Sequence, residues 1–294
     1  TIRAVQEDVF RRDPLRMMRA VRLSAVLGFE IDADTRDLIR QSSTSIVSSS
    51  PERVREELLA TLAARGARDS VRLMDDLGLL SVLIPEIDAS RGVTQPKAHH
   101  YYDVFNHLVE AVGFVEVLLD SEPNGGIVHE MMPKFDGMTE YFSSYATDMH
   151  SRLTLLKLTG LLHDIGKPPT FAITDRIRFN SHDAVGAKMA AEICQRLRVS
   201  NEASKRICDL VAYHMRIRHV QEMRSSTLVR FLRTDRFEDH LELHRVDCLS
   251  SHGKLDNFEF CKATLETLEP EHIRPDPLIN GNDLITLGHS PGPM

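Results

Sequence analysis

Apolar residues recur at helical spacing along most of the chain, and the alternating pattern that is typical of β-strands is scarce. One helix is predicted over residues 15–27, where the apolar side chains recur on a single face. Asp13 is the expected N-cap of this helix, Pro14 fits its first turn, and Gly28 is expected to end it. The predicted fold class is therefore all-α.

The same signals predict further helices. Ser50 and Pro51 are expected to start one that Gly66 ends, and Gly78 is expected to close another over about 68–77. Beyond them, helical patterns cover residues 102–119, 152–162, 184–197, 202–213, 226–232 and 238–250.

Proline and glycine residues around 85–96 indicate a boundary, so we expect one helical unit over residues 1–95 and a second helical domain over 96–268. Residues 121–150 are rich in Gly, Pro and Met, and they predict an exposed insert. A truncated C-terminal segment is expected over 269–294, and its last twenty residues, from Pro275, are rich in Pro and Gly and predict no packed element.

Composition excludes several classes of protein. Hydrophobic residues make up 42% of the chain and charged residues 27%, which excludes collagenous and wholly disordered chains. The four cysteines form no CxxC pair and are too few for a disulfide scaffold, which favours a reducing compartment. No apolar run approaches the ~18 residues of a membrane span. We therefore expect a soluble cytoplasmic protein that does not associate with membranes.

The net charge is -7, but positive charge is concentrated in two segments. Residues 11–22 contain five arginines and one aspartate, and residues 196–236 contain ten Arg or Lys against four Asp or Glu. Across the chain 28 of the 36 basic residues are arginines, which favour forked contacts to carboxylates and phosphates. Each segment is either a phosphate-facing surface or a solvated helix face.

The most specific stretch is the pair His163-Asp164, which lies at the end of an apolar helix and is followed by Gly166 and Pro168. Because the chain turns sharply there, neighbouring side chains can converge. Imidazole and carboxylate together suit a divalent ion such as Mn²⁺, Fe²⁺, Zn²⁺ or Mg²⁺. The alternative for a bare dipeptide is a hydrogen bond that caps the helix.

The surroundings of this pair resemble the HD superfamily of metal-dependent phosphohydrolases, over residues 96–265. That resemblance implies that His107, His163, Asp164 and Asp247 bind one divalent ion, with Mg²⁺, Mn²⁺, Ni²⁺, Co²⁺, Fe²⁺ and Zn²⁺ not distinguished. The ion would lower the pKa of a bound water and neutralise a phosphoryl oxygen.

Three further residues fall at informative positions of that resemblance. His182 and His214 occupy the places where two-metal members of the superfamily carry extra histidines, so they hold a second ion, contact phosphate, or only cap and pack helices. Lys167 is expected to take part in catalysis, with His163 and Asp164, by contacting phosphate.

The front half resembles the neck of bacterial tRNA nucleotidyltransferases and poly(A) polymerases. The resemblance rests on RDPLRMMRAVRL at 12–23 and LGFEID at 27–32, with SPERVREEL at 50–58 and LINGNDL at 278–284 matching later segments. In that family the residues that match Asp13 and Arg16 read the Watson–Crick edge of ATP or CTP. Arg19 and Arg22 continue the row, and they face phosphate or RNA unless they form a solvated face.

Nucleotidyl transfer needs paired carboxylates after a Gly-Ser loop, and the sequence shows no such element. Asp32 and Asp34 have the right spacing, but they lie within the neck. We therefore interpret the chain as the C-terminal portion of a template-independent RNA nucleotidyltransferase, which adds CCA to tRNA or makes poly(A). Its expected partners are a tRNA or other RNA 3′ end, a nucleoside triphosphate, and a palm domain supplied in cis or as a separate chain.

Two other functions fit the same residues. One is a stand-alone HD-type phosphohydrolase that acts on phosphomonoesters or 2′,3′-cyclic phosphates. The other is a non-catalytic RNA-binding module that uses the basic segments 11–22 and 196–236.

Overall fold

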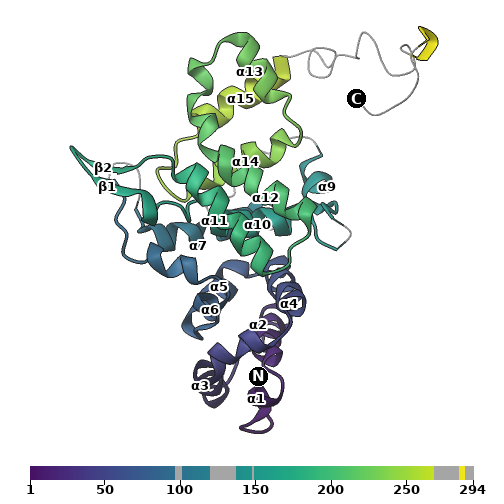
Figure 1. Cartoon of the computed structure of the whole chain (residues 1–294), viewed down its shortest axis with the longest axis vertical. Coiled ribbons are helices and arrows are strands. Elements are labelled where there is room, and N and C mark those ends of the chain that lie inside the picture. Colours follow the sequence, from purple (N-terminus) through teal and green to yellow (C-terminus); the bar gives the residue numbers. More distant parts are fainter. Residues whose placement is uncertain (97–100, 120–136, 148, 268–284, 289–294) are drawn as a thin grey trace.

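The structure is a computed structural model, which describes residues 1–96, 101–119, 137–147, 149–267 and 285–288. The expected all-α class is confirmed, because the one sheet in these ranges is a two-stranded hairpin. The helices of the first 95 residues lie at one end, and the later helices stack above them (Figure 1). None of the described helices combines the length and the apolarity needed to cross a bilayer.

The first part of the chain is a series of short helices. They are α1 (Val9–Arg12), α2 (Leu15–Leu27), α3 (Ala33–Ser42), the 3₁₀ helix η1 (Ser43–Ser48), α4 (Pro51–Ala63), α5 (Ala67–Asp76), α6 (Leu79–Leu83) and η2 (Pro85–Ser90).

The second part contains longer helices and the hairpin. Its elements are α7 (Val104–Glu116), η3 (Val117–Leu119), α9 (Met138–Ser143), α10 (Arg152–Leu162), η4 (Pro168–Thr170), β1 (Phe171–Ile173), β2 (Ile177–Phe179), α11 (His182–Arg196), α12 (Asn201–Tyr213), η5 (His214–Glu222), α13 (Ser225–Leu232), α14 (Phe237–Leu249) and α15 (Asp256–Thr267).

Turn residues set most helix ends as predicted, with two corrections. Ser50 caps α4 by accepting a hydrogen bond from the N–H of Arg53, and Gly28 ends α2 with a left-handed φ of 65°. Asp13 does not cap α2, because its backbone closes the preceding helix α1 and no side chain caps α2. Gly66 does not end α4, which stops at Ala63; with a φ of 74° Gly66 instead precedes α5.

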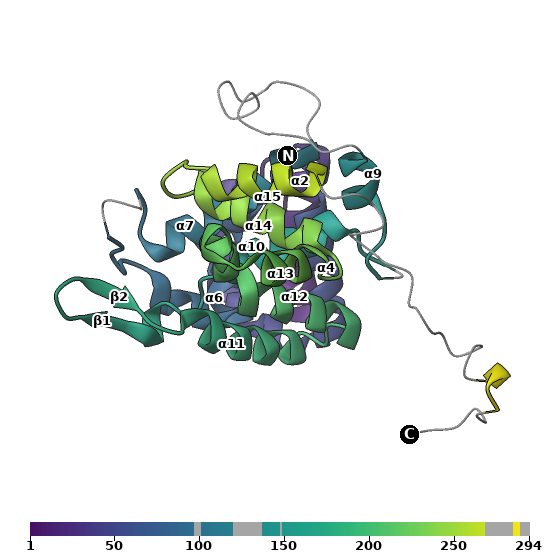
Figure 2. The same cartoon turned by 90° about the horizontal axis from the view of Figure 1, so that it is seen from above.

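Some elements were not predicted. Helix α3 buries only Thr35 and Ile39, so its apolar signal is weak. The strands β1 and β2 have three residues each, too few for an alternating pattern, and they pair antiparallel with Phe171 opposite Phe179. The hairpin projects beside α11 at the edge of the helical body (Figure 2). Most of the expected insert over 121–150 and the segment 269–294 lie outside the described residues.

One apolar core joins the front helices to α7, α10, α11 and α12. Lys157 of α10 strengthens this junction, since its buried ammonium group donates to the carbonyl oxygens of Leu62 at 2.8 Å and Ala64 at 3.2 Å. These carbonyls belong to the end of α4, where helical partners are missing. Helix α10, which ends at the His163-Asp164 pair, is thereby fixed on the front half.

A second close contact lies just after the C-terminal end of α10. The turn that follows α10 meets the start of α11 backbone to backbone at Gly166: a Cβ atom there would overlap the carbonyl oxygen of His182 and lie 2.5 Å from the nitrogen of Gly186. Only glycine fits this contact without movement. It places Asp164 against the first turn of α11.

We expect Gly166→Ala to lower the free energy of unfolding by about 1–3 kcal/mol or more, because the backbone segments must separate to admit the methyl group. Urea unfolding measures this. Gly160→Ala is the matched control in α10, since a Cβ there would lie an ordinary 3.6 Å from Ala111. Equal stability of the two variants would show that the Gly166 contact is not tight.

Candidate metal centre

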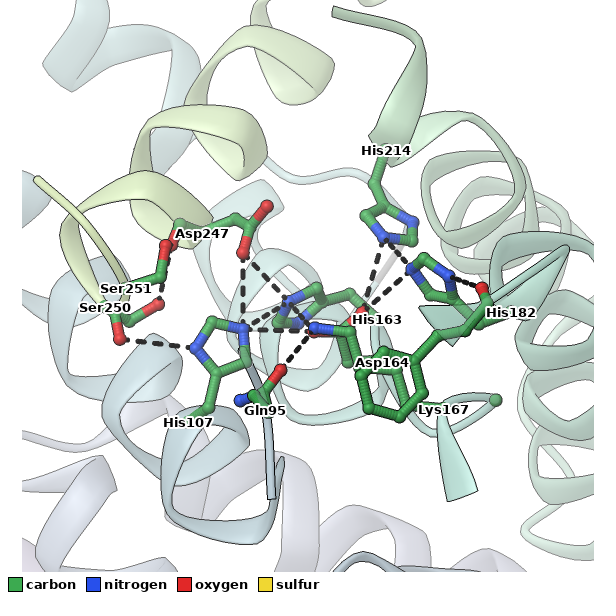
Figure 3. A network of polar contacts seen from close by, with 12 residues as sticks. Gln95, His107, His163, Asp164, Lys167, His182, His214, Asp247, Ser250 and Ser251 are labelled. Carbon is green, nitrogen blue, oxygen red and sulfur yellow. Dashed lines mark hydrogen bonds and ion pairs between the residues drawn. The ribbon is translucent and has the colours of Figure 1, made fainter. Parts of the chain in front are cut away.

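The residues of the expected metal site come from five separate elements, and the structure brings all of them together (Figure 3). Helix α7 supplies one histidine, the end of α10 supplies the His-Asp pair, and α11, η5 and α14 each supply one residue. The set is His107, His163, Asp164, His182, His214 and Asp247. All except Asp247 are buried.

Four of these residues form a first group. The Nε2 atom of His107 lies 3.1 Å from Oδ2 of Asp164 and 3.2 Å from Oδ1 of Asp247. The Nε2 atom of His163 lies 3.3 Å and 3.7 Å from the same two oxygens, and 3.0 Å from Nε2 of His107. Two imidazole nitrogens and two carboxylate oxygens therefore face one point.

A second group shares Asp164. Its Oδ1 atom lies 3.3 Å from Nε2 of His182 and 3.5 Å from Nε2 of His214, and these two nitrogens are 3.3 Å apart. Asp164 is only 1% exposed, and among the described residues neither of its side-chain oxygens has a hydrogen bond of good geometry, although the ammonium of Lys167 lies 2.5 Å from Oδ2. Asp164 thus presents one oxygen to each group.

Backbone carbonyls fix the orientation of all four imidazoles. The Nδ1 atom of each ring lies 2.7–3.3 Å from a carbonyl oxygen, namely those of Ser250, Gly160, Phe179 and Val211 for His107, His163, His182 and His214. A carbonyl only accepts, so Nδ1 of each ring carries a hydrogen, and Nε2 is the nitrogen that faces inward, where its lone pair can bind a metal ion when the ring is deprotonated. A bound cation would satisfy nitrogen lone pairs that point toward one another and toward carboxylates. A hydrogen bond from Nδ1 to a backbone carbonyl is also typical of histidines that bind metal through Nε2. The donor set therefore fits a metal ion.

Charges in the metal-free chain follow the same geometry. Burial opposes protonation of His163, but the carboxylates of Asp164 and Asp247 outweigh it and raise the pKa of its imidazole to about 10. Burial would raise the pKa of Asp164, but the ammonium of Lys167 and the ring of His163 hold it well below its usual range. Protons and Lys167 thus supply the positive charge that a metal ion would bring.

Lys167 lies beside the ligands. Its Nζ atom is 2.5 Å from Oδ2 of Asp164 and donates to Oε1 of Gln95 at 2.7 Å. Gln95 was not expected at the site, because it belongs to no motif and comes from a segment far away in the sequence.

A cavity of about 410 Å³ opens over the two groups of ligands. The basic side chains of Lys167, Arg176 and Arg218 line it, and the apolar side chains of Phe179 and Met215 form part of its wall. Arg176 belongs to the turn of the β1–β2 hairpin, which brings it to the mouth of the site. A basic cavity with an apolar wall fits an anionic substrate that carries an organic group.

Like Gln95, His244 was not expected at the site, because it matches no motif in the sequence. It is buried in α14, lines the cavity, and lies with its Nε2 atom 3.6 Å from Sγ of Cys248. Burial is the main cause that lowers the pKa of its imidazole to about 4, so the ring is neutral.

The expected nucleotide-reading residues lie together at the start of α2. The Nε atom of Arg16 is 3.5 Å from Oδ2 of Asp13, and Arg16 is half exposed. Arg19 and Arg22 both bind Glu57 of α4, with Nε–O distances of 3.1 Å and 2.7 Å. Sequence reasoning missed Glu57, which lies within the 50–58 segment.

Comparison with known proteins adds independent observations. Residues 28–91 match the family described as a probable RNA and SrmB-binding site of polymerase A, and residues 136–242 match the HD domain. His107 and Asp247 lie outside the second match, so the fold and not the matched segment places them with His163 and Asp164.

Relatives match almost the entire chain. It is 32% identical to an A-adding tRNA nucleotidyltransferase of Deinococcus radiodurans and 29% identical to a CC-adding tRNA nucleotidyltransferase of Thermus thermophilus, over 99% and 98% of its length. The chain spans 64% and 61% of those relatives.

A solved structure of a CCA-adding enzyme in complex with CTP has the same fold, with a TM-score of 0.53 and 17% identity over 99% of this chain and 55% of that one. Its likeness agrees with the sequence matches. The chain is thus similar to tRNA nucleotidyltransferases along almost its entire length, and separate segments of it match the HD domain and the polymerase A RNA-binding site.

Proposed function

We propose that this chain is the C-terminal, RNA-handling portion of a tRNA nucleotidyltransferase and that its HD centre is a metal-dependent phosphohydrolase. The observation that carries the second statement is the convergence of four Nε2 lone pairs and two carboxylates beneath a basic cavity. Similarity to tRNA nucleotidyltransferases along almost the whole chain and the RNA-binding match of residues 28–91 support the first.

Two divalent ions fit the ligands, one in each group, with Asp164 between them. His107, His163 and Asp247 would hold the first, and His182 and His214 the second. The mixed nitrogen and oxygen donors suit Mn²⁺, Fe²⁺, Co²⁺, Ni²⁺ or Zn²⁺ better than Mg²⁺, which prefers oxygen. A bound ion would lower the pKa of a water and polarise the phosphoryl group.

The side chains around the ligands bind and orient the substrate. Lys167, Arg176 and Arg218 would hold phosphate oxygens as fixed cations, and Lys167 reaches the phosphate from its position beside Asp164. Phe179 and Met215 would pack on the organic part of the ester. Phosphomonoesters and 2′,3′-cyclic phosphates both fit this division of the cavity.

The front half would serve nucleotide addition. Asp13 offers acceptors and Arg16 a planar set of donors, the pair of groups needed to read a base edge of ATP or CTP. Arg19 and Arg22 would contact RNA phosphates as Glu57 holds them in place. In this proposal residues 1–95 form the neck and body, and residues 96–268 form the HD domain. A palm domain outside this sequence would supply the carboxylates for nucleotidyl transfer.

A non-catalytic RNA-binding module is the second candidate, and the match of residues 28–91 favours it. An RNA-binding module of this kind needs no metal ion, so it leaves the buried set of metal-binding side chains unexplained.

We expect the wild-type chain to bind about two Mn²⁺ ions. Asp247→Ala should lose the first ion, His182→Ala the second, and Asp164→Ala both, because only Asp164 faces both groups. Isothermal titration of the metal-free protein measures the stoichiometry. Retention of both ions in Asp164→Ala would contradict the shared position of this carboxylate.

Hydrolysis of 4-nitrophenyl phosphate should require Mn²⁺, Co²⁺, Ni²⁺ or Mg²⁺ and fall at least about 100-fold in Asp164→Ala, because metal-ligand loss removes the ions. Release of nitrophenolate is followed by absorbance. Glu192→Ala, an exposed carboxylate on α11, is the matched control and should keep full activity. Absence of hydrolysis by the wild-type chain with any of these ions would sink the phosphohydrolase proposal.

The chain alone should not extend a tRNA that lacks its 3′ end when it is given Mg²⁺ and labelled ATP or CTP, because the palm carboxylates are to come from elsewhere. Gel electrophoresis of the labelled tRNA is the measurement. Robust extension would show that the chain itself carries a transferase site.

A further inference from the structure

Arginines differ in their partners between the two parts of the chain. In the front half most arginines face a carboxylate, as Arg40 does with Asp76 at 2.6 Å and Arg72 with Glu110 at 2.7 Å. On η5 and α13 and at the two ends of α13, no carboxylate among the described residues pairs with Arg216, Arg224, Arg230 or Arg233. Positive charge is neutralised locally in one region and left open in the other.

The open arginines are dense and exposed. Residues 214–233 contain five arginines and a single acidic residue, Glu222, which pairs with His219. Helix α13 turns Leu228, Phe231 and Leu232 inward. Arg230 and Arg233 are three residues apart on its exposed side, so their guanidinium groups lie on one face.

This surface continues into the metal cavity. Arg218 lines the cavity beside Asp164 and Asp247, and Arg216 lies two residues earlier on the same short helix. The guanidinium of Arg216 stacks over the ring of Phe231 in α13 at 4.7 Å and lies 5.9 Å from the ring of Tyr213. Basic side chains thus occur at the cavity, on η5 and on α13. Helix α13 lies at the upper end of the molecule in Figure 1.

Tyr213 adds an aromatic surface next to these cations. Its side chain is 49% exposed, and the next residue is the ligand His214. Exposed aromatic rings between unpaired arginines are the components of sites for single-stranded nucleic acid, where bases stack and cations follow the phosphates. A lipid surface would need exposed apolar side chains, and α13 turns its own inward.

We propose that η5 and α13 form a surface for single-stranded RNA that guides the end of the strand into the HD metal cavity. Arg230 and Arg233 hold backbone phosphates, Tyr213 and Arg216 stack on bases, and Arg218 holds the phosphate nearest the ligands. The role of this surface in guiding RNA to the cavity rests on the proposed phosphohydrolase function. Binding of RNA to the surface needs no metal.

The test uses the whole chain in EDTA, so that binding is measured apart from hydrolysis. The probe is a fluorescein-labelled single-stranded RNA of about 12 nucleotides, followed by fluorescence anisotropy between roughly 50 and 200 mM salt. The test variant is Arg230→Glu with Arg233→Glu. The matched control is Lys188→Glu with Lys205→Glu, which reverses two exposed cations on α11 and α12 and changes the net charge equally.

We expect the arginine variant to bind RNA about tenfold more weakly, with a salt slope smaller by about one to two, while the lysine control stays within about twofold of wild type. Tyr213→Ala should also weaken binding, and Tyr213→Phe should restore it, because stacking needs only the ring. Thermal unfolding confirms that each variant is folded.

Equal RNA affinity of the arginine variant and the lysine control would overturn the inference. The inference would also be overturned if the arginine variant lost binding to vesicles that contain phosphatidylserine but kept its RNA binding, because the surface would then bind a membrane. A wild-type chain that hydrolyses no nitrophenyl phosphate, combined with weakened RNA binding of the arginine variant, would refute the phosphohydrolase and keep the RNA surface.

Discussion

The structure around the site depends on one constraint, which is that the buried carboxylate of Asp164 needs positive charge on both of its oxygens. Imidazole Nε2 atoms approach it from two sides, and in the deprotonated rings that bind metal these atoms present lone pairs and not hydrogens to the carboxylate. An isolated buried carboxylate is costly, and in the metal-free chain Lys167 and protonated His163 offset that cost. Metal ions would do the same more completely, because each would satisfy several lone pairs at once.

The surrounding packing keeps this arrangement from relaxing. Gly166 allows the turn after α10 to touch the start of α11, which holds Asp164 against His182. Lys157 ties α10 to the end of α4, and carbonyl oxygens lock the histidine rings. In α14 the buried pair Glu242 and Arg245 stands close to Asp247 in sequence, and both side chains are fully buried. Rigid supports of this kind hold ligands whose mutual repulsion would otherwise move them apart.

How far the sequence predicts this protein depends on whether a feature is local. The limits of α2 and α10 follow from periodicity and turn residues and agree with the structure. Helix α3 and the β1–β2 hairpin were not predicted, because a weak apolar face and three-residue strands leave little local signal in the sequence. The six residues of the candidate metal site were named through a family resemblance, and periodicity alone would not have joined His107 to Asp247.

The sequence by itself determined the helical class, the sharp turn at His163 and Asp164, and the uneven distribution of arginine, because these depend on residues close together in the chain. Only the tertiary structure decided which side chains meet. It places Lys167 against Gln95 and Asp164, and Arg19 and Arg22 against Glu57. Arg230 and Arg233 have no carboxylate partner within the part of the chain that the structure describes. The reason is physical: packing between distant segments sets where charges lie, and local propensity carries no information about those contacts.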